Sequence, residues 1–104
     1  MVEMLQVQIK HPGIALTKTE QRLIECLVMR ICVHHLYRRV AKPFRIRPAR
    51  VDSIHLVVNQ DVIVEEGLTE EEAHVIMRDL ENDIRHTLDL CELSTEEVVL
   101  TAKA

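Results

Sequence analysis

The stretch LQVQIKHPGIALTKTE, residues 5–20, decides the fold because it joins a strand pattern directly to a helix start. Apolar and polar residues alternate over residues 5–10, and this period of two is typical of a half-buried strand. Thr17 and Glu20 then form a capping box, in which each side chain bonds the backbone N–H of the other residue. We therefore expect a strand, a turn at the intervening His-Pro-Gly, and a helix.

The rest of the chain continues this alternation of strand and helix patterns. We expect the first helix to run from about Lys18 to about Val40, with Pro43 stopping it. A second capping box, from Thr69 to Glu72, predicts a helix from about Glu70 to about Leu93.

Short β-branched segments predict the remaining strands. Residues 54–64 indicate either a hairpin, with Asn59-Gln60-Asp61 as its loop, or one continuous strand. Residues 44–47 form an edge strand at best, because Pro48 follows them and lacks an amide donor. Residues 98–101 predict a last strand, with a further helical turn as the alternative.

The expected order is strand, helix, strand, strand, helix, strand. It predicts the split βαβ arrangement of ferredoxin-like proteins, an α+β two-layer sandwich with two helices on a small antiparallel sheet. A chain of 104 residues is the size of one domain, so we expect a single domain over residues 1–104.

Charge is divided between the two halves of the chain. Residues 1–50 hold ten of the 13 Lys and Arg side chains but three of the 17 acids. Residues 51–104 hold the remainder, and the net charge is −4. Opposed charge fields steer encounters and select partners without identifying them.

The hydrophobic pattern of the sequence argues against a membrane protein and a secreted protein. No window approaches the roughly 18 apolar residues of a membrane span, and no basic start precedes an apolar run. We therefore expect a cytoplasmic protein with neither a membrane span nor a secretory signal. Cys26, Cys32 and Cys91 lie in apolar helical stretches, and we expect them to be reduced thiols of the core.

The two expected helices differ in their apolar faces. The helix over 70–93 has one apolar face, which its own sheet covers. The helix over 18–40 has one apolar face in its first half and another, nearly opposite, in its second half. One sheet cannot cover both sides, so the second face must meet a second copy, another protein or the connector 43–53. The residues expected in this binding surface are Met29, Val33, Leu36, Tyr37 and Val40, bordered by Arg38, Arg39 and Arg45.

These features favour a small regulatory or inhibitory protein that works by protein–protein binding. We expect a homodimer, because symmetric dimers are the commonest oligomers, and a helix face is a standard recognition element. The protein would occupy an interface of its target, for example a transcription regulator. Tyr37 and Arg38 are of the types that dominate interface energetics.

A nucleic-acid-binding module is the alternative function. Arginine forks suit phosphates, and Phe44 could stack on a base. The net charge of −4 opposes this alternative, because the acidic half of the chain repels a polyanion. The cations that would contact nucleic acid are Arg38, Arg39, Lys42, Arg45, Arg47 and Arg50.

Catalytic and metal-binding motifs are absent from the sequence. It contains no Gly-rich phosphate loop and no Gly-x-Ser-x-Gly elbow. Cys32 and His35 form one i,i+3 pair, whereas zinc sites usually combine two such pairs. We interpret Asp79, Asp83 and His86 as a solvated polar face, and we expect no enzyme activity, cofactor or metal.

Overall fold

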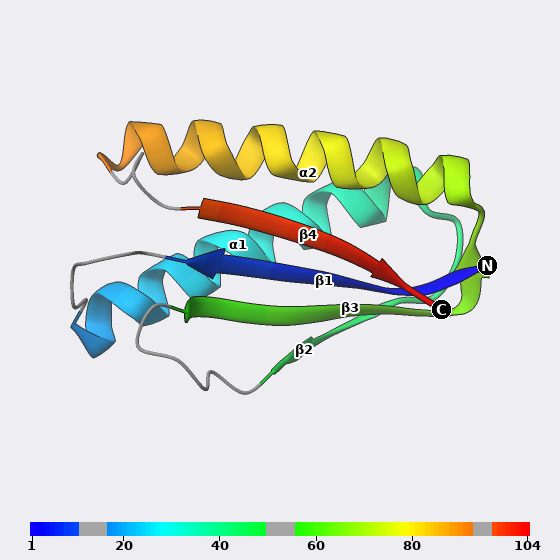
Figure 1. Cartoon of the computed structure of the whole chain (residues 1–104), viewed down its shortest axis with the longest axis horizontal. Coiled ribbons are helices and arrows are strands. Elements are labelled where there is room, and N and C mark those ends of the chain that lie inside the picture. Colours follow the sequence, from blue (N-terminus) through cyan, green and yellow to red (C-terminus); the bar gives the residue numbers. More distant parts are fainter. Residues whose placement is uncertain (11–16, 50–55, 93–96) are drawn as a thin grey trace.

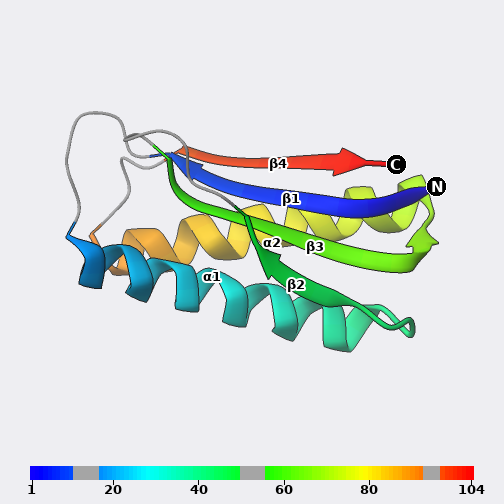
Figure 2. The same cartoon turned by 90° about the horizontal axis from the view of Figure 1, so that it is seen from below.

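The structure, a computed structural model, describes residues 1–10, 17–49, 56–92 and 97–104. Its elements are β1 (Val2–Lys10), α1 (Lys18–Arg39), β2 (Arg45–Pro48), β3 (Leu56–Leu68), α2 (Glu70–Leu90) and β4 (Glu97–Lys103). The strands form one antiparallel sheet in the order β2-β3-β1-β4. Both helices lie against one face of this sheet (Figure 1, Figure 2), which confirms the predicted α+β sandwich.

Both helices begin at the predicted capping boxes. The Thr17 hydroxyl accepts a hydrogen bond from the Glu20 N–H, and the Glu20 carboxylate accepts one from the Thr17 N–H, each at 3.1 Å. Thr69 and Glu72 repeat this arrangement at the start of α2. The hydrogen bonds from Thr17 and Thr69 lower the pKa of Glu20 and Glu72, because they stabilise the charged carboxylates.

The polar segment Asn59-Gln60-Asp61 lies inside one continuous strand, β3, so the hairpin interpretation is wrong and its alternative is confirmed. Gln60 faces the helices and donates a hydrogen bond to the Glu25 carbonyl at 2.9 Å. Asp61 faces the opposite side of the sheet and accepts one from Arg47 at 3.0 Å. One oxygen each of Gln60 and Asp61 is buried without a hydrogen bond among the described residues. Tertiary partners, not a turn, therefore hold these polar side chains.

The other element boundaries follow the predictions with small differences. The last segment forms the strand β4 and not a helical turn, and the basic connector contains the short edge strand β2. Helix α2 ends at Leu90, before the expected end at Leu93, which lies outside the described residues. Glu92, just after the helix, has a left-handed backbone with φ of 61°, as is common at helix ends.

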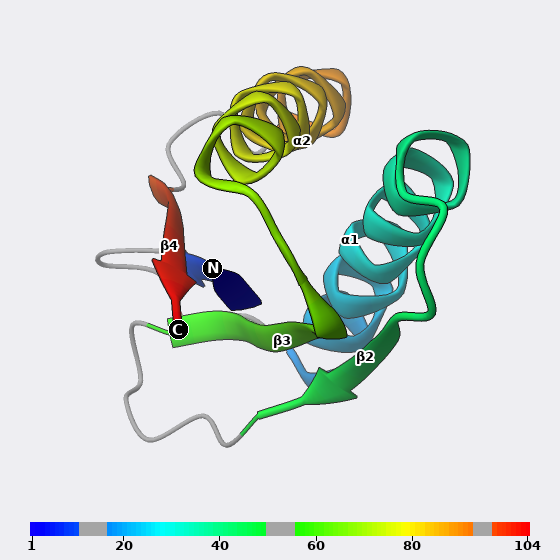
Figure 3. The same cartoon turned by 90° about the vertical axis from the view of Figure 1, so that its right-hand side faces the viewer.

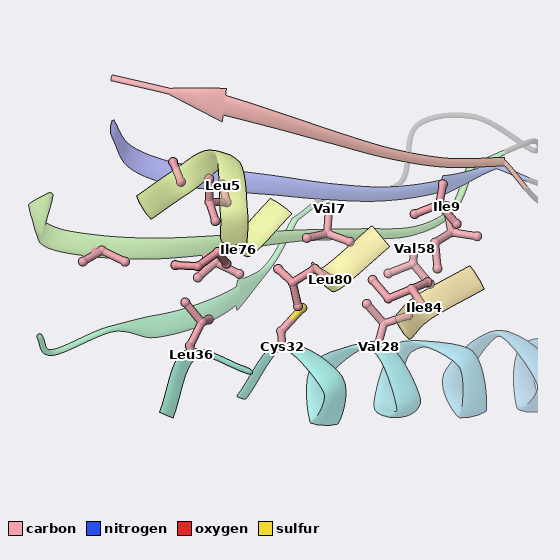
Figure 4. Close-up of a cluster of buried hydrophobic side chains, with 14 of the residues drawn as sticks. Leu5, Val7, Ile9, Val28, Cys32, Leu36, Val58, Ile76, Leu80 and Ile84 are labelled. Atoms are coloured by element: carbon pink, nitrogen blue, oxygen red, sulfur yellow. The ribbon is translucent and has the colours of Figure 1, made fainter. Parts of the chain in front are cut away.

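The core fills the space between the sheet and the two helices (Figure 4). Leu5, Val7 and Ile9 of β1 face the helices and are buried, as the alternation over residues 5–10 predicts. Phe44, one of two aromatic residues in the chain, packs against the edge of this core and is partly buried. The labelled residues of Figure 4 are Leu5, Val7, Ile9, Val28, Cys32, Leu36, Val58, Ile76, Leu80 and Ile84.

The buried stripe of α1 winds around the helix. It consists of Ile24, Val28, Cys32 and Leu36, followed by the cap residue Val40. A spacing of four residues turns the stripe by about 40° per step, so its two ends differ by about 160°. In the sequence this single stripe resembles two opposite faces. Leu36 and Val40 are therefore core residues, and their predicted place in the partner-binding surface is wrong.

Truncation of two leucines of α1 tests this placement. We expect Leu36→Ala to lower the free energy of unfolding by about 3 kcal/mol, because it leaves a cavity in the core. Leu23→Ala is the matched control, since Leu23 is 59% exposed, and it should change stability by less than about 0.5 kcal/mol. Urea unfolding followed by circular dichroism measures both values, and equal losses would contradict the assigned orientation of α1.

Candidate protein-binding surface on the first helix

A second stripe, here called the outer stripe, lies on the side of α1 opposite the core. It consists of Leu23, Cys26, Arg30, Val33 and Tyr37, all of them exposed. Their spacing alternates between three and four residues, the period of helices that pack against other helices. Figure 3 shows that one side of the α1 ribbon faces away from both the sheet and α2, and the exposed outer stripe lies opposite the buried one. The outer stripe therefore has no neighbour within the described part of the chain.

All members of the outer stripe except Leu23, together with neighbouring side chains, line a shallow groove of about 560 Å³. Its surface is mainly apolar, with basic groups along the margin. The structure thus brings together four of the residues predicted for partner binding, Met29, Val33, Tyr37 and Arg38. The lining residues are Cys26, Met29, Arg30, Val33, His34, Tyr37 and Arg38.

Two predicted members of the surface point elsewhere. Arg39 makes an ion pair with Asp79 of α2, and therefore lies between the helices. Arg45 belongs to β2, where its Nε lies 3.6 Å from a carboxylate oxygen of Glu65. Of the three arginines predicted for the border, Arg38 lines the groove, whereas Arg39 and Arg45 lie outside it.

Acidic groups of the same chain also pair with the rest of the basic segment. Lys42 donates a hydrogen bond to the Gly67 carbonyl at 2.8 Å, and its Nζ lies 3.9 Å from a Glu72 oxygen. Arg47 pairs with Asp61 at 3.0 Å. Intramolecular pairing thus partly neutralises the cations that we considered for nucleic acid.

Two members of the basic segment differ from the others. Arg38 has no carboxylate partner among the described residues, and its side chain lines the groove on α1. Arg50 lies outside the described residues. Among the described cations of the basic segment 38–50, Arg38 is therefore the one whose charge is not paired with a described acid of the same chain.

Two side-chain contacts join α1 to α2. The His35 Nε2–H donates to Asp83 at 2.8 Å, one turn from the Arg39–Asp79 pair. Each pair is four residues from the other on both helices, as expected for antiparallel helices. Asp79 and Asp83, which we interpreted as a solvated face, thus bind α1.

Four residues of the surface were not predicted, namely Leu23, Cys26, Arg30 and His34. The three-and-four spacing from Leu23 to Tyr37 was the signal that could have identified the first three of them, whereas His34 lies beside this stripe. This spacing was hard to recognise in the sequence because the buried stripe, with its spacing of four, lies on the same helix.

The cysteines differ in burial, which corrects the prediction of three core thiols. Cys32 is buried, whereas Cys26 and Cys91 are exposed. Burial raises the pKa of Cys32 to about 12, since the thiolate loses its hydration. Among the described residues, no cluster of three or more His, Cys, Asp and Glu side chains could hold a metal ion. None of the described helices has the length and apolar character needed to cross a membrane.

Comparison with known proteins shows the fold alone. No protein-family model and no curated protein matches the chain. The chain is similar to the solution NMR structure of a de novo designed protein with a ferredoxin fold, with a TM-score of 0.61 and 16% sequence identity. The match covers 100% of this chain and 86% of the designed chain. A likeness at this identity supports a ferredoxin-type α+β fold and carries no function.

Thiol reactivity tests the burial of the cysteines. We expect Cys26 and Cys91 to react with Ellman's reagent in the folded protein at neutral pH. Cys32 should react at a comparable rate only after denaturation, because the thiolate is the reactive form and its raised pKa suppresses it. Absorbance at a series of urea concentrations reports the count of reacting thiols, and three rapid thiols without urea would contradict the buried position of Cys32.

Proposed function

We propose that this chain is a protein-binding module whose outer stripe recognises an acidic amphipathic helix of a target protein. The observation that carries the proposal is the combination of an exposed apolar stripe with arginines that have no acidic partner among the described residues. We propose that the fold carrying this stripe has the ferredoxin-like split βαβ topology, and the strand order β2-β3-β1-β4 supports it.

The apolar part of the outer stripe is suited to helix packing. Tyr37 is 81% exposed and Val33 is 41% exposed, although both are apolar side chains of a regular helix. Exposed apolar stripes with a polar border are typical of interaction surfaces. An amphipathic helix lying in such a groove would bury its own apolar face there.

The charges around the stripe favour an acidic partner. Arg22, Arg30 and Arg38 have no carboxylate partner among the described residues, whereas Arg39, like Lys42, faces an acid of its own chain. The three free arginines recur every eight residues along the exposed side of α1. A helix whose apolar stripe is flanked by Asp or Glu would complement this pattern.

The same charges disfavour the binding of a second copy at this stripe. If two α1 helices packed antiparallel about the centre of the stripe, Arg30 would face Arg30 of the second copy. Arg22 would face Arg38 at both ends, so three positions would juxtapose like charges. Such pairs oppose association, and a homodimer of this protein needs a different surface.

The proposed role is regulatory or inhibitory and acts by occupancy, without catalysis. A helix held on the outer stripe could not take part in the assembly of its own protein. Transcription regulators are one class of target, because many assemble through amphipathic helices.

Nucleic-acid binding receives less support as the alternative. Ion pairs occupy Arg39, Lys42, Arg45 and Arg47, and Phe44 is partly buried against the core. A polyanion would have to displace these intramolecular acids.

A designed probe tests the proposal. The probe is a fluorescent synthetic helix with a leucine stripe flanked by glutamates, and fluorescence anisotropy measures its affinity. Val33→Glu should weaken binding at least tenfold, because it places an acid in the groove opposite the acids of the probe. Val75→Glu is the matched control, since Val75 is 38% exposed on the other helix, and it should leave the affinity unchanged. Added salt should weaken the wild-type complex.

Two results would contradict the proposal. One is equal affinity of the probe for the wild type and Val33→Glu. The other is tight, salt-dependent binding of labelled DNA or RNA that Val33→Glu leaves intact and that Arg45→Glu with Arg47→Glu abolishes. That second result would replace the proposal with the nucleic-acid alternative.

A further inference from the structure

We propose that β4 pairs antiparallel with β4 of a second copy, centred on Leu100, so that two sheets become one continuous sheet. This interface is separate from the outer stripe and does not depend on its function. The partner is a second copy because the edge of β4 is complementary to itself.

The two edges of the sheet are unequally protected. The edge strand β2 has four residues and contains Arg45, Arg47 and Pro48, all of which discourage pairing with another strand. The edge strand β4 has seven residues, no proline and no charge between its terminal Glu97 and Lys103. It is therefore the edge that remains open to a partner strand.

The composition of β4 favours further pairing. Val98, Val99 and Thr101 are β-branched, and Leu100 is partly buried against the core. Within the described part of the chain β1 is the one strand hydrogen-bonded to β4. The outer backbone groups of β4 thus have no strand partner there. Arg85 donates to the Val98 carbonyl at 3.4 Å, and a carbonyl oxygen can accept a second hydrogen bond.

The register centred on Leu100 brings opposite charges together. In this register Glu97 of each copy faces Lys103 of the other, so symmetry produces two ion pairs. Neither side chain has an ion pair among the described residues of its own chain. Opposite charges directly across a strand pair stabilise it.

The side chains between the charged ends also match. Val99 would face Thr101, a β-branched pair on the open face of the sheet, where Glu97 and Lys103 also lie. On the helix face, Val98 would face Ala102 and Leu100 would face its own copy. No polar group is buried by these contacts, and every residue keeps the face that it has in the single chain.

The positions of the helices are compatible with this dimer. On the one face that both helices cover, α2 contacts β4 and β1, whereas α1 contacts β3, toward the opposite edge of the sheet. The β4 edge and α1 therefore lie at different sides of the molecule (Figure 3). A dimer through β4 would leave both outer stripes exposed, and it would present two binding surfaces to a target.

Charge reversal at the two ends of β4 tests the proposal. Sedimentation equilibrium over a concentration series should show a dimer for the wild type. Glu97→Lys alone and Lys103→Glu alone should each raise the dimer dissociation constant roughly tenfold, because two like-charge pairs replace two ion pairs. The double variant Glu97→Lys with Lys103→Glu should restore the wild-type value. Arg78→Glu, an exposed change on α2, is the charge control and should have no effect.

Hydrogen exchange provides a readout that does not depend on substitutions. Amides of β4 should lose protection on dilution below the dimer dissociation constant, while amides of α1 should not. A monomer at millimolar concentration, a dimer insensitive to both single reversals, or a double variant that stays weak would each overturn the proposal. A dimer that Val33→Glu dissociates would also overturn it, by assigning self-association to the outer stripe. Failure of the acidic-helix probe to bind would leave this dimer unaffected, so the two proposals fail separately.

Discussion

The arrangement of this protein depends on how α1 packs on the sheet. The helix buries one stripe of residues spaced by four, from Ile24 to Val40, and this stripe turns by about 160° along the helix. Rows of this spacing are inclined to the helix axis and pack well against a neighbour that crosses at an angle. Because the core takes this stripe, the stripe with alternating spacing of three and four, from Leu23 to Tyr37, remains on the opposite side. The exposed surface is thus a consequence of the packing that forms the core.

Ion pairs within the chain accompany the packing of α1, and they leave only some of its basic side chains available to a partner. His35 and Arg39 of α1 pair with Asp83 and Asp79 of α2, and these contacts match the rotation that the buried stripe gives α1. Much of the apparent division of charge in the sequence is cancelled inside the fold, where strands and helices bring the basic and acidic halves together. On the outer side of α1, Arg22, Arg30 and Arg38 have no acidic partner in the part of the chain that the structure describes. The charge pattern of the folded surface therefore differs from that of the sequence, and it is the surface that a partner meets.

The sequence predicted the elements better than the surfaces. Capping boxes and alternation are local signals, so both helix starts and the first strand could be predicted. The hairpin at Asn59-Gln60-Asp61 was wrong because the partners of Gln60 and Asp61, the Glu25 carbonyl and Arg47, are distant in the sequence. Leu36 was assigned to the wrong surface because one buried stripe that winds around a helix gives the same sequence pattern as two separate apolar faces. Pairing of the basic segment with acids of the same chain also required the tertiary structure, because the paired residues lie in different elements.

The central claim is that the outer stripe of α1 is the recognition surface, and amide chemical-shift mapping tests it most directly. The ¹⁵N-labelled protein would be titrated with the acidic helix at constant protein concentration, which holds any self-association fixed. The account predicts that shifted amides cluster on the outer side of α1 between Leu23 and Arg38, with the sheet unchanged. Shifts concentrated on β2 and the open face of the sheet, with α1 unaffected, would contradict it.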